Sequence, residues 1–183
     1  MAKVKPKIVP VVAPLKLDLG CGPNKRDGFH GVDAMPFDGK VDTVFDLRKT
    51  PWPWKNDSVD EVHCSHFLEH LDGSERVPFM NELYRVLRKD AKATIIVPHW
   101  SSERAYGDPT HKWPPVVAFS TYYLDKTWRA QNAPHVGFTC DFHVVGGNTI
   151  GHPWTMRTQE VQGFAQTHYI NVSQDMILTL TKR

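Results

Sequence analysis

The feature that most constrains the fold is an apolar strand that ends in a glycine turn, residues 15–24 (LKLDLGCGPN). Its leucines alternate with polar residues, which indicates a short strand with one apolar face. Gly20 and Gly22 let the backbone turn sharply and approach a ligand where a Cβ atom would clash. An acid within the strand, Asp18, followed by glycines at its carboxyl end, is what a nucleotide-like cofactor needs at the edge of an α/β sheet.

Two later strand candidates also end in acids. Asp33 closes residues 29–33 (FHGVD), and Asp46 belongs to residues 41–47 (VDTVFDL). A carboxylate at such a strand end can accept hydrogen bonds from both hydroxyls of a ribose, which is the role we expect for Asp33. Asp46 could accept the exocyclic amine of an adenine, with the Leu47 backbone beside the ring.

The motifs that follow carry a family resemblance. Residues 51–62 (PWPWKNDSVDEV) lead through a fourth strand to residues 65–71 (SHFLEHL), a helix at 82–88 (ELYRVLR) and a strand at 93–98 (ATIIVP). In this order they resemble the class I S-adenosylmethionine-dependent methyltransferases, above all small bacterial and phage members that carry G-C-G-P-N and L-E-H-L. The resemblance covers about residues 15–98, with a weaker echo at 108–111 (DPTH).

This resemblance implies a Rossmann-like α/β fold, with a mostly parallel seven-stranded sheet whose last strand is antiparallel. It also implies S-adenosylmethionine as cofactor. The family's cofactor positions correspond here to Asp18, Gly20, Cys21, Gly22, Asp33, Ala34, Asp46, Leu47, Ser65 and His66. Only nine residues separate Gly22 from Val32, too few for a strand and a full helix, so we expect a shortened first crossover.

Periodicity and end signals give the remaining elements. The best helix spans residues 74–89, where apolar residues recur at helical spacing. Asp72 and Glu75 form a capping-box-like start. After this helix, Asp90 replaces the family's usual glycine and tolerates the left-handed conformation of a helix end. The other expected elements are strands near 15–20, 29–33, 41–46, 59–65, 93–98, 137–146 and 170–181, and helices at 120–129 and 155–167.

Length and composition predict one domain over residues 15–183, preceded by an N-terminal arm at 1–14. Prolines at positions 6, 10 and 14 interrupt any signal-peptide core. No run of about 18 apolar residues predicts a membrane span. Three cysteines without a CxxC pattern favour a cytoplasmic protein. A net charge of +2, with scattered basic residues, does not indicate a nucleic-acid partner, although a locally basic cleft would still allow one.

Residues 99–119 follow the fifth strand at the edge where a ligand would lie. We interpret them as an acceptor-side loop that closes over the methyl group; the alternative is a surface loop whose Trp100 and Trp113 pack on the core. Methyl transfer needs a general base only if the acceptor must lose a proton. His111, oriented by Asp108, is the first candidate, followed by His66 and then His99; each could instead be structural.

The histidines also raise the question of a metal. His63, His66 and His70 lie close in sequence, and Glu69, His99 and His111 lie nearby in the expected sheet order. Strand and loop positions need not converge, however, and no HExxH or CxxC motif supports a site. We therefore expect no metal, and we expect His70 to bond to backbone in the turn.

Three functions remain open. The favoured one is an enzyme that transfers a methyl group from S-adenosylmethionine to an unidentified oxygen, nitrogen or carbon acceptor. The second is a non-catalytic protein of the same fold that binds the cofactor or a partner. The third is a nicotinamide-nucleotide-binding oxidoreductase, which the missing third glycine and the acid at the third strand disfavour. The sequence identifies neither the acceptor nor the oligomeric state.

Overall fold

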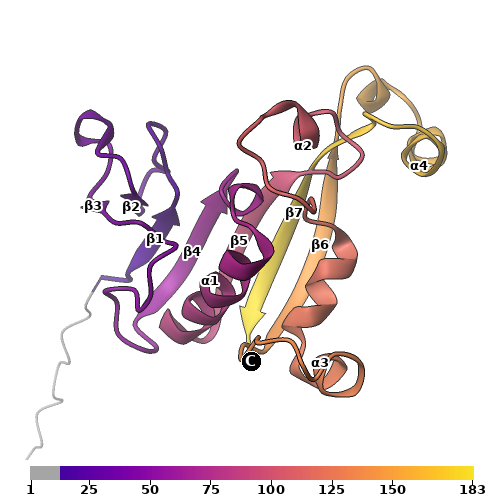
Figure 1. The fold of residues 1–183 in the computed structure, drawn as a ribbon. Helices are drawn as coiled ribbons and strands as arrows, with labels where there is room; N and C mark the ends of the chain where they lie inside the picture. The colour runs from indigo at the N-terminus through magenta and orange to yellow at the C-terminus, as the bar shows by residue number, and fades with distance from the viewer. Residues whose placement is uncertain (1–12) are drawn as a thin grey trace, which may run out of the picture.

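The sheet has seven strands in the order β3-β2-β1-β4-β5-β7-β6 (Figure 1). The structure is a computed structural model that describes residues 13–183, so most of the predicted arm at 1–14 lies outside the described residues. Strands β3, β2, β1, β4 and β5 pair in parallel, whereas β7 is antiparallel to both β5 and β6. The predicted fold class is therefore confirmed. The strands are β1 Lys16–Leu19, β2 His30–Asp33, β3 Thr43–Val44, β4 Val59–Ser65, β5 Leu87–Pro98, β6 Phe142–Ile150 and β7 Ser173–Lys182.

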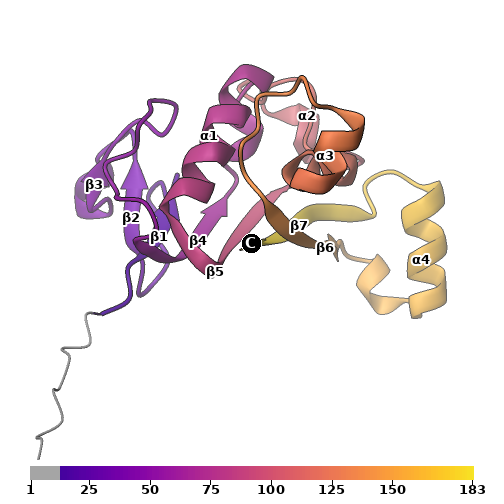
Figure 2. The ribbon, with the colours of Figure 1, turned by 90° about the horizontal axis from the view of Figure 1, so that it is seen from below.

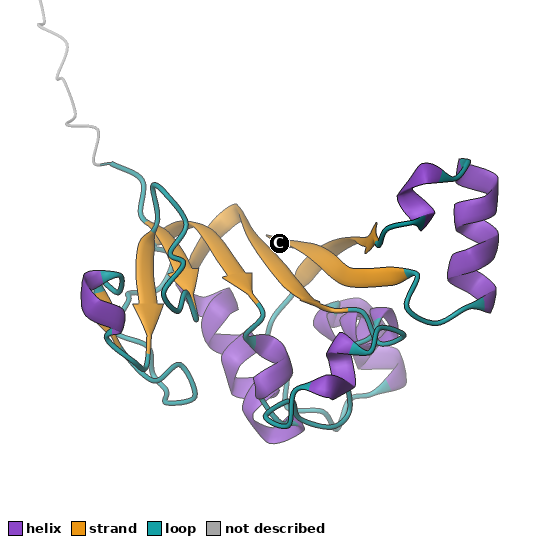
Figure 3. Cartoon of the chain, turned by 90° about the horizontal axis from the view of Figure 1, so that it is seen from above, coloured by secondary structure: helices purple, strands orange, loops and turns teal. Residues whose placement is uncertain are grey.

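The main helices α1 and α3 lie on the same side of the sheet, and α4 lies beyond the carboxyl end of β6 (Figures 2 and 3). The helical segments are η1 Phe37–Gly39, η2 Leu68–His70, α1 Gly73–Val86, α2 Arg104–Gly107, η3 Ala118–Leu124, α3 Lys126–Asn132, η4 Trp154–Met156 and α4 Gln159–His168. None of the helices described between residues 13 and 183 has the length and apolar character of a membrane span.

The opposite face of the sheet is less covered, because the first two crossovers are short. Residues 20–29 connect β1 to β2 without a helix, as predicted, and the β2–β3 connection contains only η1. The strands reflect this asymmetry: Ile95 and Leu178 are buried toward the helices, whereas their neighbours Ile96 and Ile177 are half-buried on the other face. The core thus lies mainly between the sheet and α1.

Helix α1 begins at the predicted capping box. The Asp72 carboxylate accepts hydrogen bonds from the backbone N–H groups of Ser74 and Glu75, and the Glu75 side chain accepts one from the Asp72 N–H. Its end differs from the prediction, since α1 stops at Val86 and not at residue 89. Leu87 already pairs with Val59 in the sheet, and this long-range pairing overrides the helical pattern of residues 87–89.

Asp90 has the left-handed conformation that its residue type favours, with φ of 64°. It lies inside β5, however, where the register with β4 shifts between Val59 and Glu61. The predicted role of Asp90 at a helix end is therefore wrong: the residue forms part of an irregularity in a strand.

Other boundaries also move. The helix expected at 120–129 is divided into η3 and α3 by Asp125, whose side chain accepts a hydrogen bond from the Trp128 N–H at 2.8 Å and caps α3. The helix expected at 155–167 is divided into η4 and α4. Strand β3 has two residues, and β6 and β7 begin later than predicted.

Candidate functional site

The carboxyl ends of β1, β2, β4 and β5 lie at one edge of the sheet, where ligands bind in open α/β folds. The glycine turn follows β1 and is fixed against β2. Gly20 and Cys21 donate their N–H groups to the Val32 carbonyl at 2.8 and 3.2 Å, and Gly22 donates to Asp33 Oδ2 at 3.0 Å. Both glycines have positive φ, 67° for Gly20 and 53° for Gly22, which explains glycine at both positions.

At Gly20 the backbone is in close contact with another side chain of the protein, that of Phe67. A Cβ atom there would lie 2.5 Å from the ring of Phe67, whereas one at Gly22 would meet no atom within 4 Å. The missing side chain of Gly20 thus makes room for Phe67, and the approach of a ligand to this turn stays a prediction. Cys21 beside it is buried, and burial raises the pKa of its thiol to about 11, so the group stays protonated near neutral pH.

Asp18 is buried and has partners on both oxygens. Oδ2 accepts a hydrogen bond from the Arg26 N–H at 2.7 Å, and Oδ1 lies 2.9 Å from His63 Nδ1. Asp18 therefore holds the short first crossover against β4. His63 is thus bound to Asp18, and it is not part of the group of possible metal ligands formed by Glu69, His70 and His111.

Four predicted cofactor residues meet at a cavity of about 150 Å³: Asp33, Ala34, Asp46 and Leu47. The rest of its lining consists of Phe45, Arg48, Phe67, His70 and Leu71. We name it the cofactor-side cavity. Phe67 and Arg48 were not predicted here, and no local sequence signal places either side chain in this cavity.

Both carboxylates of the cofactor-side cavity have partners of their own. Asp33 accepts hydrogen bonds from the Gly22 N–H and, through Oδ1, from the Met35 N–H at 3.0 Å. Asp46 forms an ion pair with Arg48, at 2.9 Å between Oδ1 and Nε and 3.1 Å between Oδ2 and Nη2. Hydrogen bonding from Arg48 lowers the pKa of the Asp46 carboxyl below its usual range. A ligand amine at Asp46 must share the carboxylate with Arg48.

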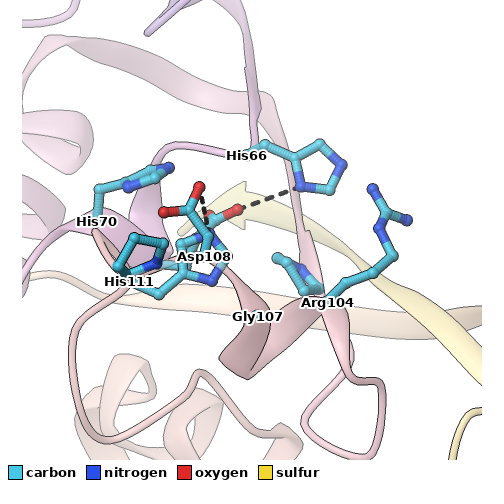
Figure 4. Close-up of a pocket in the computed structure, with 9 residues that line it drawn as sticks. His66, His70, Arg104, Gly107, Asp108 and His111 are labelled. Carbon is cyan, nitrogen blue, oxygen red and sulfur yellow. Dashed lines mark hydrogen bonds and ion pairs between the residues drawn. The ribbon is translucent and has the colours of Figure 1, made fainter.

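A second, larger cavity of about 580 Å³ opens next to the first (Figure 4). We name it the acceptor-side cavity. It contains the three predicted catalytic candidates His66, Asp108 and His111, and also Arg104, which sequence analysis missed. His70 borders both cavities. The complete lining is His66, Glu69, His70, Pro98, Arg104, Gly107, Asp108, Pro109 and His111.

His66 directly follows β4 and has φ of 53°, which is uncommon outside glycine and often occurs at functional sites. Its Nδ1 lies 3.2 Å from Glu69 Oε1, and its Nε2 lies 3.8 Å from Asp175 Oδ1. The hydrogen bond to Glu69 raises the pKa of the imidazole. Ser65, the last residue of β4, is half-buried and lines neither cavity.

The expected pairing of His111 with Asp108 is wrong. The nearest atoms of the two groups, His111 Nε2 and Asp108 Oδ2, are 3.9 Å apart, too far for a hydrogen bond. Asp108 instead accepts hydrogen bonds from the N–H and the hydroxyl of Thr110, at 2.8 and 2.6 Å. The Ala105 carbonyl orients His111, 3.2 Å from its Nδ1.

Two further expectations about histidines are corrected. The His70 ring bonds to the side chain of Thr110, with 3.0 Å between Nδ1 and Oγ1, and not to backbone. His99 lines neither cavity; its Nδ1 lies 2.9 Å from the Ser101 hydroxyl, and burial lowers the pKa of its imidazole.

The loop at 99–119 forms part of the acceptor-side cavity through α2 and residues 107–111. Trp100 and Trp113 are 49% and 77% exposed, so the alternative in which both pack on the core is wrong. Arg76 holds the later part of the loop, after the cavity-lining residues 107–111, by donating a hydrogen bond to the Pro114 carbonyl at 2.7 Å.

Comparisons with known proteins agree with this geometry. Residues 33–95 match the family model of a methyltransferase domain, and no curated protein matches the sequence. Among solved structures, a SAM-dependent methyltransferase from Archaeoglobus fulgidus is similar, with a TM-score of 0.67, 22% identity, and coverage of 92% of this chain and 86% of that one.

Two other similar structures show the range of this fold. A geranyl diphosphate methyltransferase in complex with SAM has a TM-score of 0.51 and 16% identity, and the match covers 93% of this chain and 78% of that one. The [4+2]-cyclase SpnF has a TM-score of 0.55 and 15% identity, and the match covers 92% and 74%. Likeness at this level reports fold and not reaction. The chain therefore adopts the Rossmann-like fold of class I methyltransferases, and residues 33–95 within it match a methyltransferase domain.

Proposed function

We propose that the protein is a methyltransferase that binds S-adenosylmethionine in the cofactor-side cavity and its acceptor in the acceptor-side cavity. The observation that carries this proposal is the position of His70, which borders both cavities. Two ligands bound in them would meet beside this residue. The match of residues 33–95 to a methyltransferase domain supports the same function, because that segment supplies the whole cofactor-side lining.

In this proposal Asp33 binds the ribose hydroxyls. Each of its oxygens already accepts one backbone N–H and has a further lone pair available for a ligand. Ala34 and Leu47 supply apolar contacts to the adenine, and Asp46 accepts its amine beside Arg48. Asp18, Gly20, Cys21 and Gly22 shape the turn, and Ser65 ends β4 directly before His66 of the acceptor-side cavity.

The chemical step is a displacement at the methyl carbon. The carbon–sulfur bond of the sulfonium breaks with its electron pair remaining on sulfur, and a new bond forms to the acceptor atom. Holding the two reactants in line contributes up to about 7–11 kcal/mol to such a reaction. When the acceptor loses a proton, His111 or His66 accepts it. His111 has the suitable geometry, since the Ala105 carbonyl binds Nδ1–H and leaves the Nε2 lone pair free.

Calorimetric titration of the purified protein with S-adenosylmethionine, S-adenosylhomocysteine and NADH tests the cofactor. We expect the first two to bind in the micromolar range and NADH not to bind. Binding of NADH alone would establish the oxidoreductase alternative. Folded protein that binds none of the three would contradict the cofactor assignment and favour the non-catalytic, partner-binding alternative.

Methyl transfer itself is tested with S-adenosylmethionine labelled in its methyl group and a set of alcohol, amine and activated-carbon acceptors. We expect label to appear in one class of acceptor. Tight cofactor binding without transfer to any of them, or to material in a cell extract, would contradict the enzymatic assignment and favour a cofactor-binding protein.

A further inference from the structure

The acceptor-side cavity contains a cluster with the composition of a metal site. Glu69 and His70 come from η2 and His111 from the loop after α2, and one potential ligand atom from each lies within 4.8 Å of the others. Figure 4 shows His70, His111 and Asp108 beside one another at the cavity wall. Ligands of a tetrahedral cation lie roughly 3.3–3.6 Å apart, so only a small inward movement would complete the site.

The hydrogen bonds around the two histidines fix their tautomers. The Thr110 hydroxyl donates its single proton to Asp108 Oδ1 at 2.6 Å, so it accepts the bond from His70 Nδ1–H. The Ala105 carbonyl can only accept, so His111 Nδ1 also carries its proton. Each ring therefore has an Nε2 lone pair available. Metal-binding histidines typically donate their other N–H in this way to a carbonyl, a carboxylate or a hydrogen-bonded neighbour.

Glu69 provides the independent evidence for a ligand. Its side chain is 6% exposed, and Oε1 accepts a hydrogen bond from His66. Oε2 is buried and has no hydrogen-bond partner among the described residues. A buried carboxylate oxygen without a partner is costly, and a cation is the partner that would remove this cost.

The backbone holds the cluster together. The Glu69 carbonyl accepts the Lys112 N–H at 2.8 Å, which fixes the segment after His111 against η2. The rings of His70 and His111 are in edge contact, with centroids 4.8 Å apart. Arg76 is half-buried and donates to the loop carbonyls of Pro114 and Lys112. Its buried Nε has no hydrogen-bond partner among the described residues, and no ion pair joins Arg76 to Glu69 there.

We propose that Glu69, His70 and His111 bind a divalent transition-metal cation such as Zn²⁺ or Mn²⁺. Two imidazoles and one carboxylate are a ligand set that these cations prefer over Ca²⁺ or Mg²⁺. Asp108, whose Oδ2 is 3.9 Å from His111 Nε2, is positioned to supply a fourth ligand. The cation would face the acceptor-side cavity of about 580 Å³.

This site also narrows the acceptor, an extension that rests on the proposed function. A cation with an open position binds an oxygen of the acceptor and favours loss of its hydroxyl proton. Nε2 of His111 has a single lone pair, which the cation uses, so His66 becomes the group that takes this proton. The acceptor class is therefore a hydroxyl compound, and the methyl group passes from the sulfonium sulfur to its oxygen.

Metal binding is measured on the full chain without cofactor. Protein treated with EDTA and dialysed is titrated with CoCl₂, followed by visible absorption, and with MnCl₂, followed by electron paramagnetic resonance. We expect one cation per chain in wild-type protein. We expect Glu69→Gln and His111→Gln to bind it about tenfold more weakly or worse. His135→Gln, an exposed histidine far along the chain, is the matched control and should bind like wild type.

Circular dichroism first establishes that each variant is folded, and His70→Gln replaces any variant that is not. No stoichiometric binding in wild-type protein would overturn the proposal. Stoichiometry and affinity that the substitutions leave unchanged would also overturn it, because one of the other histidines would then be the ligand. Titration of His111→Gln with S-adenosylmethionine separates the two proposals: retained cofactor binding with lost cation binding supports the metal site by itself.

Discussion

The ring of Phe67 occupies the space where a Cβ atom at Gly20 would lie, with a separation of 2.5 Å. The two residues belong to different strand ends, Gly20 after β1 and Phe67 after β4. The contact joins the glycine turn to the segment that leads into η2. It also places Phe67 in the wall of the cofactor-side cavity.

Gly20→Ala and Gly22→Ala should therefore differ in stability. Both force alanine into a left-handed conformation, at a cost of about 1–2 kcal/mol each. Only Gly20→Ala also collides with Phe67, which adds roughly 1–3 kcal/mol. Urea unfolding measures the two losses, and equal losses would show that Phe67 moves aside freely.

Asp33→Asn should weaken binding of S-adenosylmethionine by about 1–3 kcal/mol, or roughly 5- to 150-fold. The amide keeps an oxygen for the Gly22 N–H, but it loses the bond from the Met35 N–H and the charge that strengthens bonds from ribose hydroxyls. Calorimetry measures the affinity of each variant. Glu160→Gln, which removes an exposed acid of α4, is the matched control. Unchanged affinity in Asp33→Asn would mean that the ribose binds elsewhere.

Lys182→Met should destabilise the fold. The Lys182 ammonium is nearly buried and donates to Asp57 Oδ1 and to the Leu87 carbonyl, both at 2.7 Å. Methionine fills the same space but leaves that carbonyl without its partner, a loss of about 1–3 kcal/mol. The exposed Lys89→Met serves as control in urea unfolding. A more stable Lys182→Met would show that the desolvation free energy of the buried ammonium exceeds the stabilisation from its hydrogen bonds.

Stability should decline in acid partly through Glu82. Hydrogen bonds from Arg85 at 2.7 Å to both Glu82 oxygens lower the pKa of this carboxyl. A carboxyl with a lower pKa in the folded state stabilises the protein above its unfolded pKa, about 4.3, and loses this contribution as the pH falls through the folded pKa. Glu82→Gln should therefore flatten the dependence of unfolding free energy on pH between about 6 and 3. Parallel curves for wild type and Glu82→Gln, with Glu160→Gln as reference, would contradict this assignment.

The sequence predicted the features whose signals are local. Alternating apolar residues located β1, and the spacing of Asp72 and Glu75 located the start of α1. Features that depend on distant partners were missed. One example is the end of α1, which comes early because Leu87 pairs in the sheet with Val59, 28 residues earlier in the chain.

The same distinction holds within the site. Asp33, Ala34, Asp46 and Leu47 were predicted as a group and line one cavity, because each lies at or just after the carboxyl end of a parallel strand at the same edge. The spacing of Asp108 and His111 suggested a pair, but Thr110 between them takes the carboxylate. Glu69, His70 and His111 were considered together as possible metal ligands, but a site was not expected, because only the fold shows that these three side chains meet.

The direct passage from α1 into β5 determines which parts of the site can move. Val86 ends the helix and Leu87 begins a central strand, so no flexible residue separates the two. The helix is thus anchored to the middle of the sheet and cannot pivot as an independent lever. The helix starts at Gly73, three residues after His70. Both ends of residues 66–72 are therefore held by one sheet, the first through β4 and the second through α1 and β5, so a ligand can rearrange this part of the two cavity walls only within that segment.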